Sequence, residues 1–397
     1  EPGTYKDRVL MERDPHQLIE GCLIAAYAIG AAQVFLYIRG EMAHAQERVA
    51  AALNEAYAAN LVGANILGTD FSVDIVLHWG AGAYIVGEET ALIESLEGNR
   101  GMPRLKPPYF PAAKGLYLKP TIVNNVETLS NLPWLMVHGA ESYKSVGSEA
   151  SPGTRLVAVS GHVNNPGVFE IPQGTTTYRD LFYGEQYGNG IRNGNELKMF
   201  IPGGASAPWF FPEQVDLPLE GRTVGAAGSM LGSGAIVVMD DTTDAVKACL
   251  RVVRFFARES CGKCTPCREG TTWEEKILQR ILDGHGRPSD LDLLLDVADN
   301  ISPGPYPVAA DPSQGLDAVP FPPRQTTICP LGPSSVAPIT SALRRFRSEF
   351  EAKITRRNSI AVSTEAFTAP ADESVDELVG EAAGAEPLSG TGGRFDV

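Results

Sequence analysis

Three cysteines follow one another at three-residue intervals in the middle of the chain, and a fourth lies far downstream. The three are Cys261, Cys264 and Cys267, the fourth is Cys329, and only two other cysteines occur in 397 residues. Two residues between successive cysteines let three thiolates converge on one centre, and a distant fourth can complete a four-sulfur shell. Four cysteine thiolates are common ligands of iron–sulfur clusters. The sequence therefore predicts a fold that brings two distant segments together around one cluster.

Other interpretations of these cysteines stay open. Tetrahedral zinc also takes four thiolates, but its usual pattern is two separated close pairs. Disulfide frameworks are typical of short secreted chains, which 397 residues with six cysteines do not resemble. A helix expected to start near Thr271 would place a positive dipole end close to the cysteines and favour anionic thiolates. We rank a cluster first, zinc second and unrelated thiols last.

Composition and hydropathy exclude two classes of partner. The net charge of −15 argues against nucleic acid, because phosphate binding needs a basic surface. Residues 21–38 carry no charge and reach the lower limit of membrane-spanning length. Their internal pattern instead predicts a buried helix over 16–29, a stop at Gly30 and a buried strand over 34–38. We therefore expect no direct membrane span.

The chain divides by pattern into four parts. Residues 1–150 alternate helix and strand, with helices expected over 42–60 and 88–96 and a strand over 73–79, which predicts an α/β layer with a mainly parallel sheet. Residues 151–240 predict a small mixed β module, whose simplest interpretation is a spacer or docking domain without catalytic groups. Its expected strands are 156–160, 167–171 and 197–201.

Residues 241–357 predict a helical bundle that carries the cluster on its loops. Its expected helices are 243–257, 273–282, 290–300 and 336–354. A Pro/Gly-rich stretch over 301–324 is best interpreted as an extended loop. Residues 358–397 hold eight acidic residues against one basic residue, which predicts a disordered acidic tail.

Three further stretches suggest a bound nucleotide. Residues 80–90 place glycines before Glu88 and Glu89 at a strand-to-helix junction, where backbone can approach a flat ligand and amides can face a phosphate. Residues 121–128 contain paired asparagines, and residues 1–8 form a charged turn. Each also has an ordinary interpretation, since acidic residues favour a first helical turn and Asn-Asn pairs or charged turns are common in solvated loops.

Together these stretches resemble one family, the flavin-bearing NADH-oxidising subunit of respiratory complex I. The most specific string is Glu-Ser-Cys-Gly-Lys-Cys-Thr-Pro-Cys-Arg-Glu-Gly, together with Gly-Glu-Glu-Thr at the strand-to-helix junction. The resemblance covers about residues 1–355. The matching segments are residues 1–8, 82–92, 104–108, 124–129, 259–270 and the segment around Cys329.

The resemblance implies a Rossmann-like α/β domain for FMN and NAD(H), a ubiquitin-like β-grasp domain of the SLBB type and a helical iron–sulfur domain. A [4Fe–4S] cluster would be held by Cys261, Cys264, Cys267 and Cys329. FMN would be lined by Glu88, Glu89, Asn124, Asn125 and Thr128. The nicotinamide nucleotide would face Glu1, Tyr84 and Glu89, with Phe110 or its neighbour Tyr109 near the adenine.

The chain departs from the family pattern in two places. It opens at Glu1 without methionine, after the position of the family's glycine-rich flavin loop, so we expect an N-terminally truncated fragment or processed product. Cys267 and Cys329 are 62 positions apart, a longer spacing than the family's, and the 301–324 stretch accounts for the excess. Loop-closure entropy grows only logarithmically, about 0.6 kcal/mol per doubling, so the fourth ligand remains credible.

The resemblance implies an NADH:quinone oxidoreductase component that passes hydride from NADH to FMN, then single electrons to the cluster and onward to a partner subunit. No side chain is required as a catalytic base. The expected partners are ferredoxin-like and multi-cluster subunits, and the expected location is cytoplasmic, peripheral to the membrane. Alternatives are a diaphorase subunit of a soluble NAD-linked hydrogenase or formate dehydrogenase, or a catalytically silent iron–sulfur module without the flavin loop.

Overall fold

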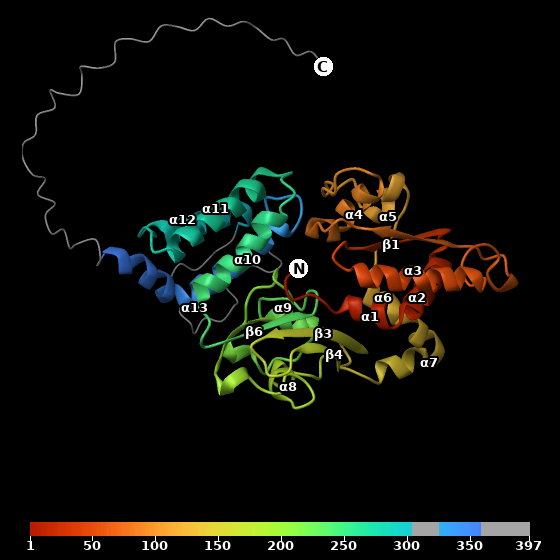
Figure 1. Cartoon of the computed structure of the whole chain (residues 1–397), viewed down its shortest axis with the longest axis horizontal. Helices are drawn as coiled ribbons and strands as arrows, with labels where there is room; N and C mark the ends of the chain where they lie inside the picture. The colour runs from red at the N-terminus through yellow and green to blue at the C-terminus, as the bar shows by residue number, and fades with distance from the viewer. Residues whose placement is uncertain (304–324, 359–397) are drawn as a thin grey trace, which may run out of the picture. The chain divides into compact units, whose positions relative to one another are not determined.

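The computed structural model describes residues 1–303 and 325–358 (Figure 1). The elements below belong to one compact unit, Glu1–Arg357. The predicted extended stretch, 301–324, and the predicted disordered tail, 358–397, lie outside the described residues at 304–324 and 359–397. Their first residues, Ile301 and Asn358, are described and each ends a helix.

A two-stranded parallel sheet covered by helices forms the core of residues 1–150, below called the first module. β1 (Gln33–Ile38) pairs with β2 (Asp74–Trp79) in parallel along its whole length. Helices α2 (Pro15–Ile29) and α3 (Ala43–Ala58) contribute to one apolar cluster with both strands. The expected alternation of helix and strand is therefore confirmed, with element ends shifted by only one or two residues.

The uncharged run over residues 21–38 is a helix followed by a strand, as its pattern predicts. α2 ends where Gly30 adopts the left-handed conformation, φ 68°, and its N–H bonds back to the carbonyl of Ala26. Glycine tolerates this conformation because it has no side chain to clash. No helix within residues 1–303 and 325–358 has the length and apolar character needed to cross a membrane.

The remaining helices of the first module are short. They are α1 (Asp7–Arg13), α4 (Glu89–Leu96), α5 (Pro111–Lys114), α6 (Val126–Ser130) and α7 (Leu132–Lys144). The interpretation of residues 1–8 as a solvated turn is wrong, because Lys6 is buried and its ammonium pairs with the carboxylates of Asp7 and Glu127.

Residues 151–240, below called the second module, fold around a four-stranded mixed sheet in the order β4-β3-β6-β5. β3 pairs antiparallel with β4 and parallel with β6, and β6 pairs antiparallel with β5. An aromatic core that includes Tyr178, Phe182 and Phe200 fills one face. The elements are β3 (Thr154–Gly161), β4 (Gly167–Pro172), α8 (Tyr178–Tyr183), β5 (Leu197–Ile201), α9 (Gly221–Ala226) and β6 (Ala235–Asp240).

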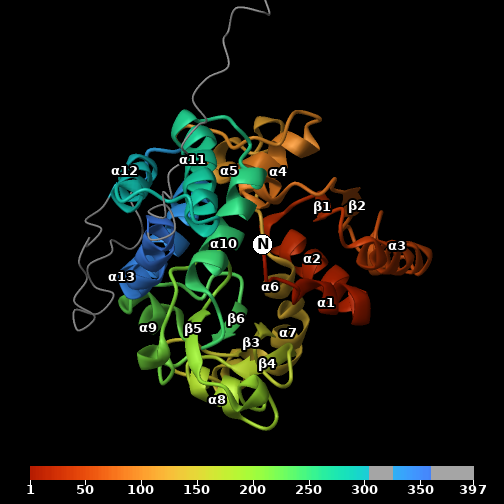
Figure 2. The ribbon, with the colours of Figure 1, turned by 60° about the vertical axis from the view of Figure 1, so that its left-hand side comes forward.

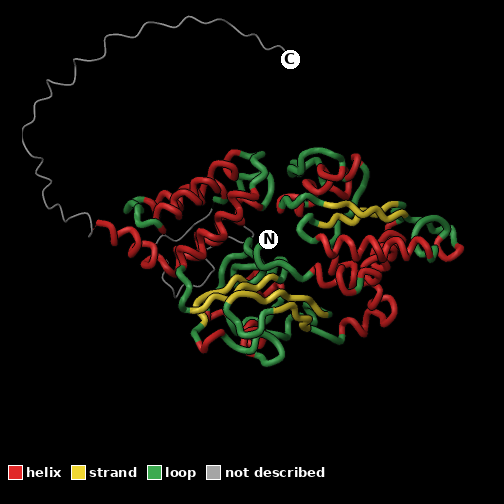
Figure 3. Tube along the Cα trace, viewed as in Figure 1, coloured by secondary structure: helices red, strands yellow, loops and turns green. Residues whose placement is uncertain are grey.

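Four helices make up most of the described part of residues 241–357, below called the helical module, and Figures 2 and 3 show them grouped together. They are α10 (Ala245–Glu259), α11 (Thr265–Leu282), α12 (Asp290–Ile301) and α13 (Leu331–Asn358). The prediction that α11 starts near residues 271–273 is wrong, since the helix begins at Thr265. Pro266 fits this first turn because its missing N–H would have no partner inside the helix.

One buried acidic residue of the helical module has no ionic partner among the described residues. Glu274 is fully buried on α11, and neither carboxyl oxygen has a partner with hydrogen-bond geometry among the described residues. Burial raises the pKa of Glu274 to about 8, and the nearby Ser335 hydroxyl, which donates to the Gly332 carbonyl, only partly opposes this. The folded protein therefore holds this carboxyl in its neutral form at pH 7.

Glu274 makes stability depend on pH in an unusual direction. Between its unfolded pKa of 4.5 and its folded pKa of about 8, the folded state keeps a proton that the unfolded state releases. The free energy of unfolding should therefore fall by about 1 kcal/mol per pH unit as pH rises through this window. Denaturant titrations from pH 5 to 8 measure this slope.

The matched variant Glu274→Leu removes the titrating group and keeps an apolar side chain of similar size. We expect its unfolding free energy to be flatter with pH and higher than that of the wild type at pH 8. Identical pH slopes in the two proteins would show that Glu274 does not carry this proton.

Candidate nucleotide and cluster site

The four predicted cluster ligands lie together at one end of the helical module. Cys264 is the N-cap of α11 and Cys267 lies in its first turn, while Cys329 lies just before α13. Cys267 and Cys329 are each 5% exposed, and Cys261 and Cys264 pack against the same apolar cluster. The distant fourth cysteine is thus brought to the triplet by the packing of α13.

The protonation of these thiols shows how closely they lie. Hydrogen bonding from Cys267 lowers the pKa of Cys264 to about 6, and the same contact raises the pKa of Cys267. Burial raises the pKa of Cys329 to about 11, and the charges of Cys261 and Cys264 act in the same direction. Cys264 and Cys267 therefore lie within hydrogen-bonding distance of each other, and Cys329 lies near enough for its charge to act on Cys267.

The donor set fits a cluster. All four side chains are cysteine, the ligand type that [4Fe–4S] clusters use. Within the described residues, no three His, Cys, Asp or Glu side chains meet closely enough to bind a single metal ion, and this includes the four cysteines. The Thr327 hydroxyl donates to the Cys329 carbonyl at 2.8 Å and fixes the turn that presents this thiol.

Described residues on the two sides of the 304–324 stretch are hydrogen-bonded to each other. The Thr326 hydroxyl donates to the Asn300 and Ile301 carbonyls at 2.7 and 3.0 Å, and the Thr326 N–H donates to Ile301 at 3.2 Å. The C-terminal end of α12 is therefore joined directly to the segment that leads into Cys329.

The first module places its glycines at the carboxyl ends of its two parallel strands. Gly40 follows β1 and Gly80 follows β2, and a Cβ on Gly40 would lie only 2.7 Å from the Gly80 carbonyl oxygen. Ligands of open parallel sheets commonly bind at this edge. The close approach of the two loops thus requires glycine and leads directly into the strand-to-helix junction.

Glu88 and Glu89 meet a lysine at that junction. Glu88 caps α4 by accepting hydrogen bonds from the Thr90 and Ala91 amides at 3.0 and 3.1 Å. Lys106 Nζ lies 2.8 Å from Glu88 and 2.7 Å from Glu89. Burial would raise the pKa of Glu88, but the hydrogen bonds from Lys106 and Thr90 outweigh it and lower that pKa.

Lys106 belongs to one of the segments that match the family, but no pattern in the sequence assigns it a role. Its loop is held by Arg104, whose guanidinium pairs with Glu94 at 2.5 Å and Glu97 at 2.6 Å while its backbone N–H donates to Thr90. The buried Arg104 therefore holds the loop in which the Lys106 ammonium contacts the predicted flavin residues.

The aromatic predicted for adenine lies on the same loop. Phe110 is 51% exposed, and the Arg104 guanidinium lies over the ring of its neighbour Tyr109. Tyr109 lines a cavity of about 370 Å³ together with Arg104 and Lys263, and Lys263 Nζ donates to the Pro103 carbonyl at 2.6 Å. Since Lys263 lies between Cys261 and Cys264, this cavity borders both the aromatic loop and the cysteine loop.

Tyr84 and Glu1 lie close to each other but have different partners. The Tyr84 N–H donates to the Glu259 carboxylate at 2.9 Å, and its ring packs edge-on against Phe255. Glu1 accepts hydrogen bonds from the Ser206 N–H and hydroxyl, in the second module. Burial raises the pKa of Tyr84, and the charges of Glu1, Cys329 and Glu259 raise it further.

The two predicted asparagines are not equivalent. The Asn125 side chain accepts from the Glu127 N–H and donates to Asp7, both at 2.9 Å, so it caps α6 and is engaged within the protein. Asn124, Asn125 and Thr128 are all exposed, so the difference between the asparagines lies in these bonds and not in burial. Of the two asparagines, Asn124 therefore has the side chain better placed to meet a ligand.

The nucleotide residues and the cysteines influence one another electrostatically. Cys329 contributes to the raised pKa of Tyr84, and Glu88 contributes to the raised pKa of Cys329. The structure joins the two segments directly, because the Tyr84 N–H donates at 2.9 Å to the carboxylate of Glu259, two positions before Cys261. The loop after β2 thus lies beside the cysteine cluster.

Two family models match the chain. Residues 1–134 match the Nuo51 FMN-binding domain, and residues 247–306 match the NADH-ubiquinone oxidoreductase-F iron-sulfur binding region. The F subunit of NADH-quinone oxidoreductase from Mycobacterium tuberculosis (strain ATCC 25618 / H37Rv) is 47% identical over 354 residues, which cover 89% of this chain and 74% of the relative. Its counterpart in Escherichia coli (strain K12) is 44% identical over the same shares.

The chain belongs to the family of the NADH-quinone oxidoreductase F subunit. It is thus an oxidoreductase subunit with an FMN-binding domain and a 4Fe–4S-binding region. A solved NAD+-reducing [NiFe]-hydrogenase in the H2-reduced state has a similar fold, with TM-score 0.74 and 33% identity. The match covers 89% of this chain but only 55% of the hydrogenase chain, so the chain spans about half of that structure's length.

The cysteine arrangement makes a direct prediction. Replacing Cys329 with Ser should lower the iron and acid-labile sulfide bound per chain more than tenfold, because the shell loses the ligand that α13 supplies. Chemical analysis and electron paramagnetic resonance of the dithionite-reduced protein measure this. The control Cys22→Ala alters a buried thiol of the first module and should leave both values unchanged. Equal loss in both variants would contradict the assignment.

Proposed function

We propose that this chain is the NADH-oxidising component of an NADH-quinone oxidoreductase. The observation that carries the proposal is that the cysteine-bearing segment is hydrogen-bonded to both predicted nucleotide loops. The Tyr84 N–H donates to the Glu259 carboxylate at 2.9 Å, and Lys263 Nζ donates to the Pro103 carbonyl at 2.6 Å. FMN, when bound, can accept a hydride and release electrons singly, and a [4Fe–4S] cluster carries one electron at a time. The residues of this chain would supply placement and charge.

The flavin would lie against the junction between β2 and α4. Glu88 is fixed by the α4 amides and by Lys106, so its orientation is set before a ligand arrives. Asn124 and Thr128 offer an exposed amide and hydroxyl, while Asn125 caps α6. Preorganised polar groups of this kind orient a cofactor without further loss of side-chain freedom.

The nicotinamide nucleotide would lie between the loop after β2 and the loop that carries Tyr109 and Phe110. Glu1, Tyr84 and Glu89 would face it, and Phe110 or Tyr109 would contact the adenine. The cavity beside Tyr109 supports this placement, because the Lys263 ammonium lines it and can meet a nucleotide phosphate, while Arg104 in the same lining is already paired with Glu94.

The three modules divide this work between them. We assign FMN and NADH binding to residues 1–150, a β-grasp fold to residues 151–240 and the cluster to residues 241–357. The mixed sheet with β3 parallel to β6 supports the β-grasp assignment. We further propose a ferredoxin-like and a multi-cluster subunit as partners, and a cytoplasmic location at the membrane surface.

The experiment that tests this function uses the subunit purified with its partner subunits and its cofactors. We expect NADH to reduce ferricyanide with two ferricyanide ions consumed per NADH, because each hydride delivers two electrons. We also expect NADH alone to produce the reduced-cluster signal. The variant Lys106→Met should lower NADH-dependent turnover at least tenfold, since it leaves Glu88 and Glu89 as an unpaired acidic couple.

Two results would contradict the proposal. A cluster signal that appears with dithionite but never with NADH would support a silent iron–sulfur module. Visible absorption absent from the reconstituted protein, with zinc as its only metal, would remove the redox function altogether. The variant Lys144→Met, in an exposed ion pair with Glu141, is the matched control and should keep full turnover.

A further inference from the structure

We propose that Lys6 and Glu127 are positioning residues for the flavin. They belong to a polar ring, with Lys6 buried at its centre, that holds the turn Asn124-Asn125, below called the asparagine turn. This inference rests on the proposed function, because it concerns the same turn. Neither residue was predicted to line a cofactor or nucleotide site.

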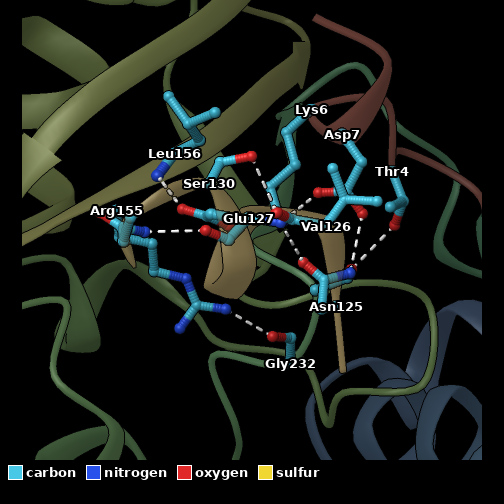
Figure 4. Close-up of polar contacts among 12 residues, drawn as sticks. Thr4, Lys6, Asp7, Asn125, Val126, Glu127, Ser130, Arg155, Leu156 and Gly232 are labelled. Carbon is cyan, nitrogen blue, oxygen red and sulfur yellow. Dashed lines mark hydrogen bonds and ion pairs between the residues drawn. The ribbon is translucent and has the colours of Figure 1, made fainter. Parts of the chain in front are cut away.

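The ring is closed by four contacts, which Figure 4 shows from one side. Lys6 Nζ lies 2.5 Å from Glu127 Oε2 and 2.6 Å from Asp7 Oδ1. The Glu127 N–H donates to Asn125 Oδ1 at 2.9 Å, and Asn125 Nδ2 donates to Asp7 Oδ2 at 2.9 Å. Each member therefore holds its two neighbours, and Asn125 cannot rotate without breaking two hydrogen bonds.

The ring is shielded from water at its charged centre. The side chains of Lys6, Glu127 and Asp7 are only 5%, 15% and 20% exposed. One ammonium faces two carboxylates, so removing it would leave two negative charges together in a poorly solvated place. Breaking such a buried pair costs far more than breaking an ion pair at the surface.

Glu127 also fastens the turn to the second module. Its Oε1 accepts the Leu156 N–H at 2.6 Å, so the first peptide groups of β3 bear directly on α6. The Arg155 guanidinium next to it donates to the Gly232 carbonyl at 2.5 Å. The asparagine turn is thus clamped from the second module through a carboxylate that touches no predicted ligand position.

The first residues of the chain also bind to the second module. The Thr4 hydroxyl contacts that of Ser233 at 2.8 Å, and the Tyr5 hydroxyl donates to the carbonyls of Val159 and Gly167. Lys6 then enters the ring, and Asp7 begins α1. Residues 1–7 therefore connect the second module to the asparagine turn, and Lys6 is the buried residue that binds this segment to the turn.

This geometry assigns different tasks to the two asparagines. The side-chain amide of Asn125 makes two hydrogen bonds within the ring. Asn124, one residue earlier, is exposed on a turn that the ring holds in place. Lys6 and Glu127 act on the flavin through this turn and not by touching it. Their loss should therefore weaken FMN binding while the fold elsewhere persists.

The test removes FMN from the protein, purified with its partners, and titrates FMN back while flavin fluorescence is followed. Lys6→Gln should raise the FMN dissociation constant at least tenfold, because Asp7 and Glu127 then repel each other. Glu127→Gln should raise it less, since Lys6 keeps Asp7 and glutamine can still accept the Leu156 N–H. The double variant should be weakened by less than the product of the two single effects, as coupled residues require.

The control Asp216→Asn disrupts an ion pair with Arg179 in which both side chains are more than half exposed, and it should leave FMN binding unchanged. Hydrogen exchange without FMN supplies a readout that does not depend on the cofactor. Lys6→Gln should raise exchange across α6 but not across α8, which lies in the second module and makes no contact with the ring residues.

An FMN dissociation constant within twofold of wild type for Lys6→Gln would overturn the inference. A rise in exchange spread evenly over α6 and α8 would overturn it too, because it marks a purely structural role. If the wild-type protein itself binds no FMN, the proposed function fails, and exchange at α6 alone then decides whether the ring controls the turn.

Discussion

The packing of α13 against α10 and α11 is the interaction on which the site depends. It brings Cys329 to a triplet of cysteines 62 or more positions earlier in the chain. The apolar cluster that achieves this includes Phe256, Ile277 and Ile339, each buried. Without this contact the four thiols would have no common location, and the loop after β2 would have no cysteine cluster beside it.

The second module has a larger part in the site than its sequence suggests. It receives Glu1 through Ser206 and holds Glu127 through the Leu156 amide. The first contact fixes a predicted ligand residue, and the second fixes the turn that carries another, although the sheet itself carries no predicted ligand. A domain without catalytic groups can still determine where those groups of its neighbour are held, because short hydrogen bonds transmit position across an interface.

The sequence patterns predicted the features that depend on neighbouring residues in the chain. The helix, glycine stop and strand over residues 16–38 follow from periodicity, and the cysteine spacing indicated one shared centre. The start of α11 was missed because Cys264 and Cys267 suggested a loop, although Pro266 is a common first-turn residue. Lys6 and Glu127 could not be found this way, since an ion pair 121 positions apart leaves no periodic signal. Lys106 lies in a segment that matches the family, but only the fold shows which carboxylates its ammonium contacts.

The hydrogen bonds of Thr326 to the end of α12 have a consequence for how this chain can vary. They join described residues on either side of the 304–324 stretch, so the segment that leads into Cys329 is tied to α12 directly. The 304–324 stretch is thus a place where length can change over evolution at little cost, and where an affinity tag or fluorescent reporter could be grafted without disturbing the electron path.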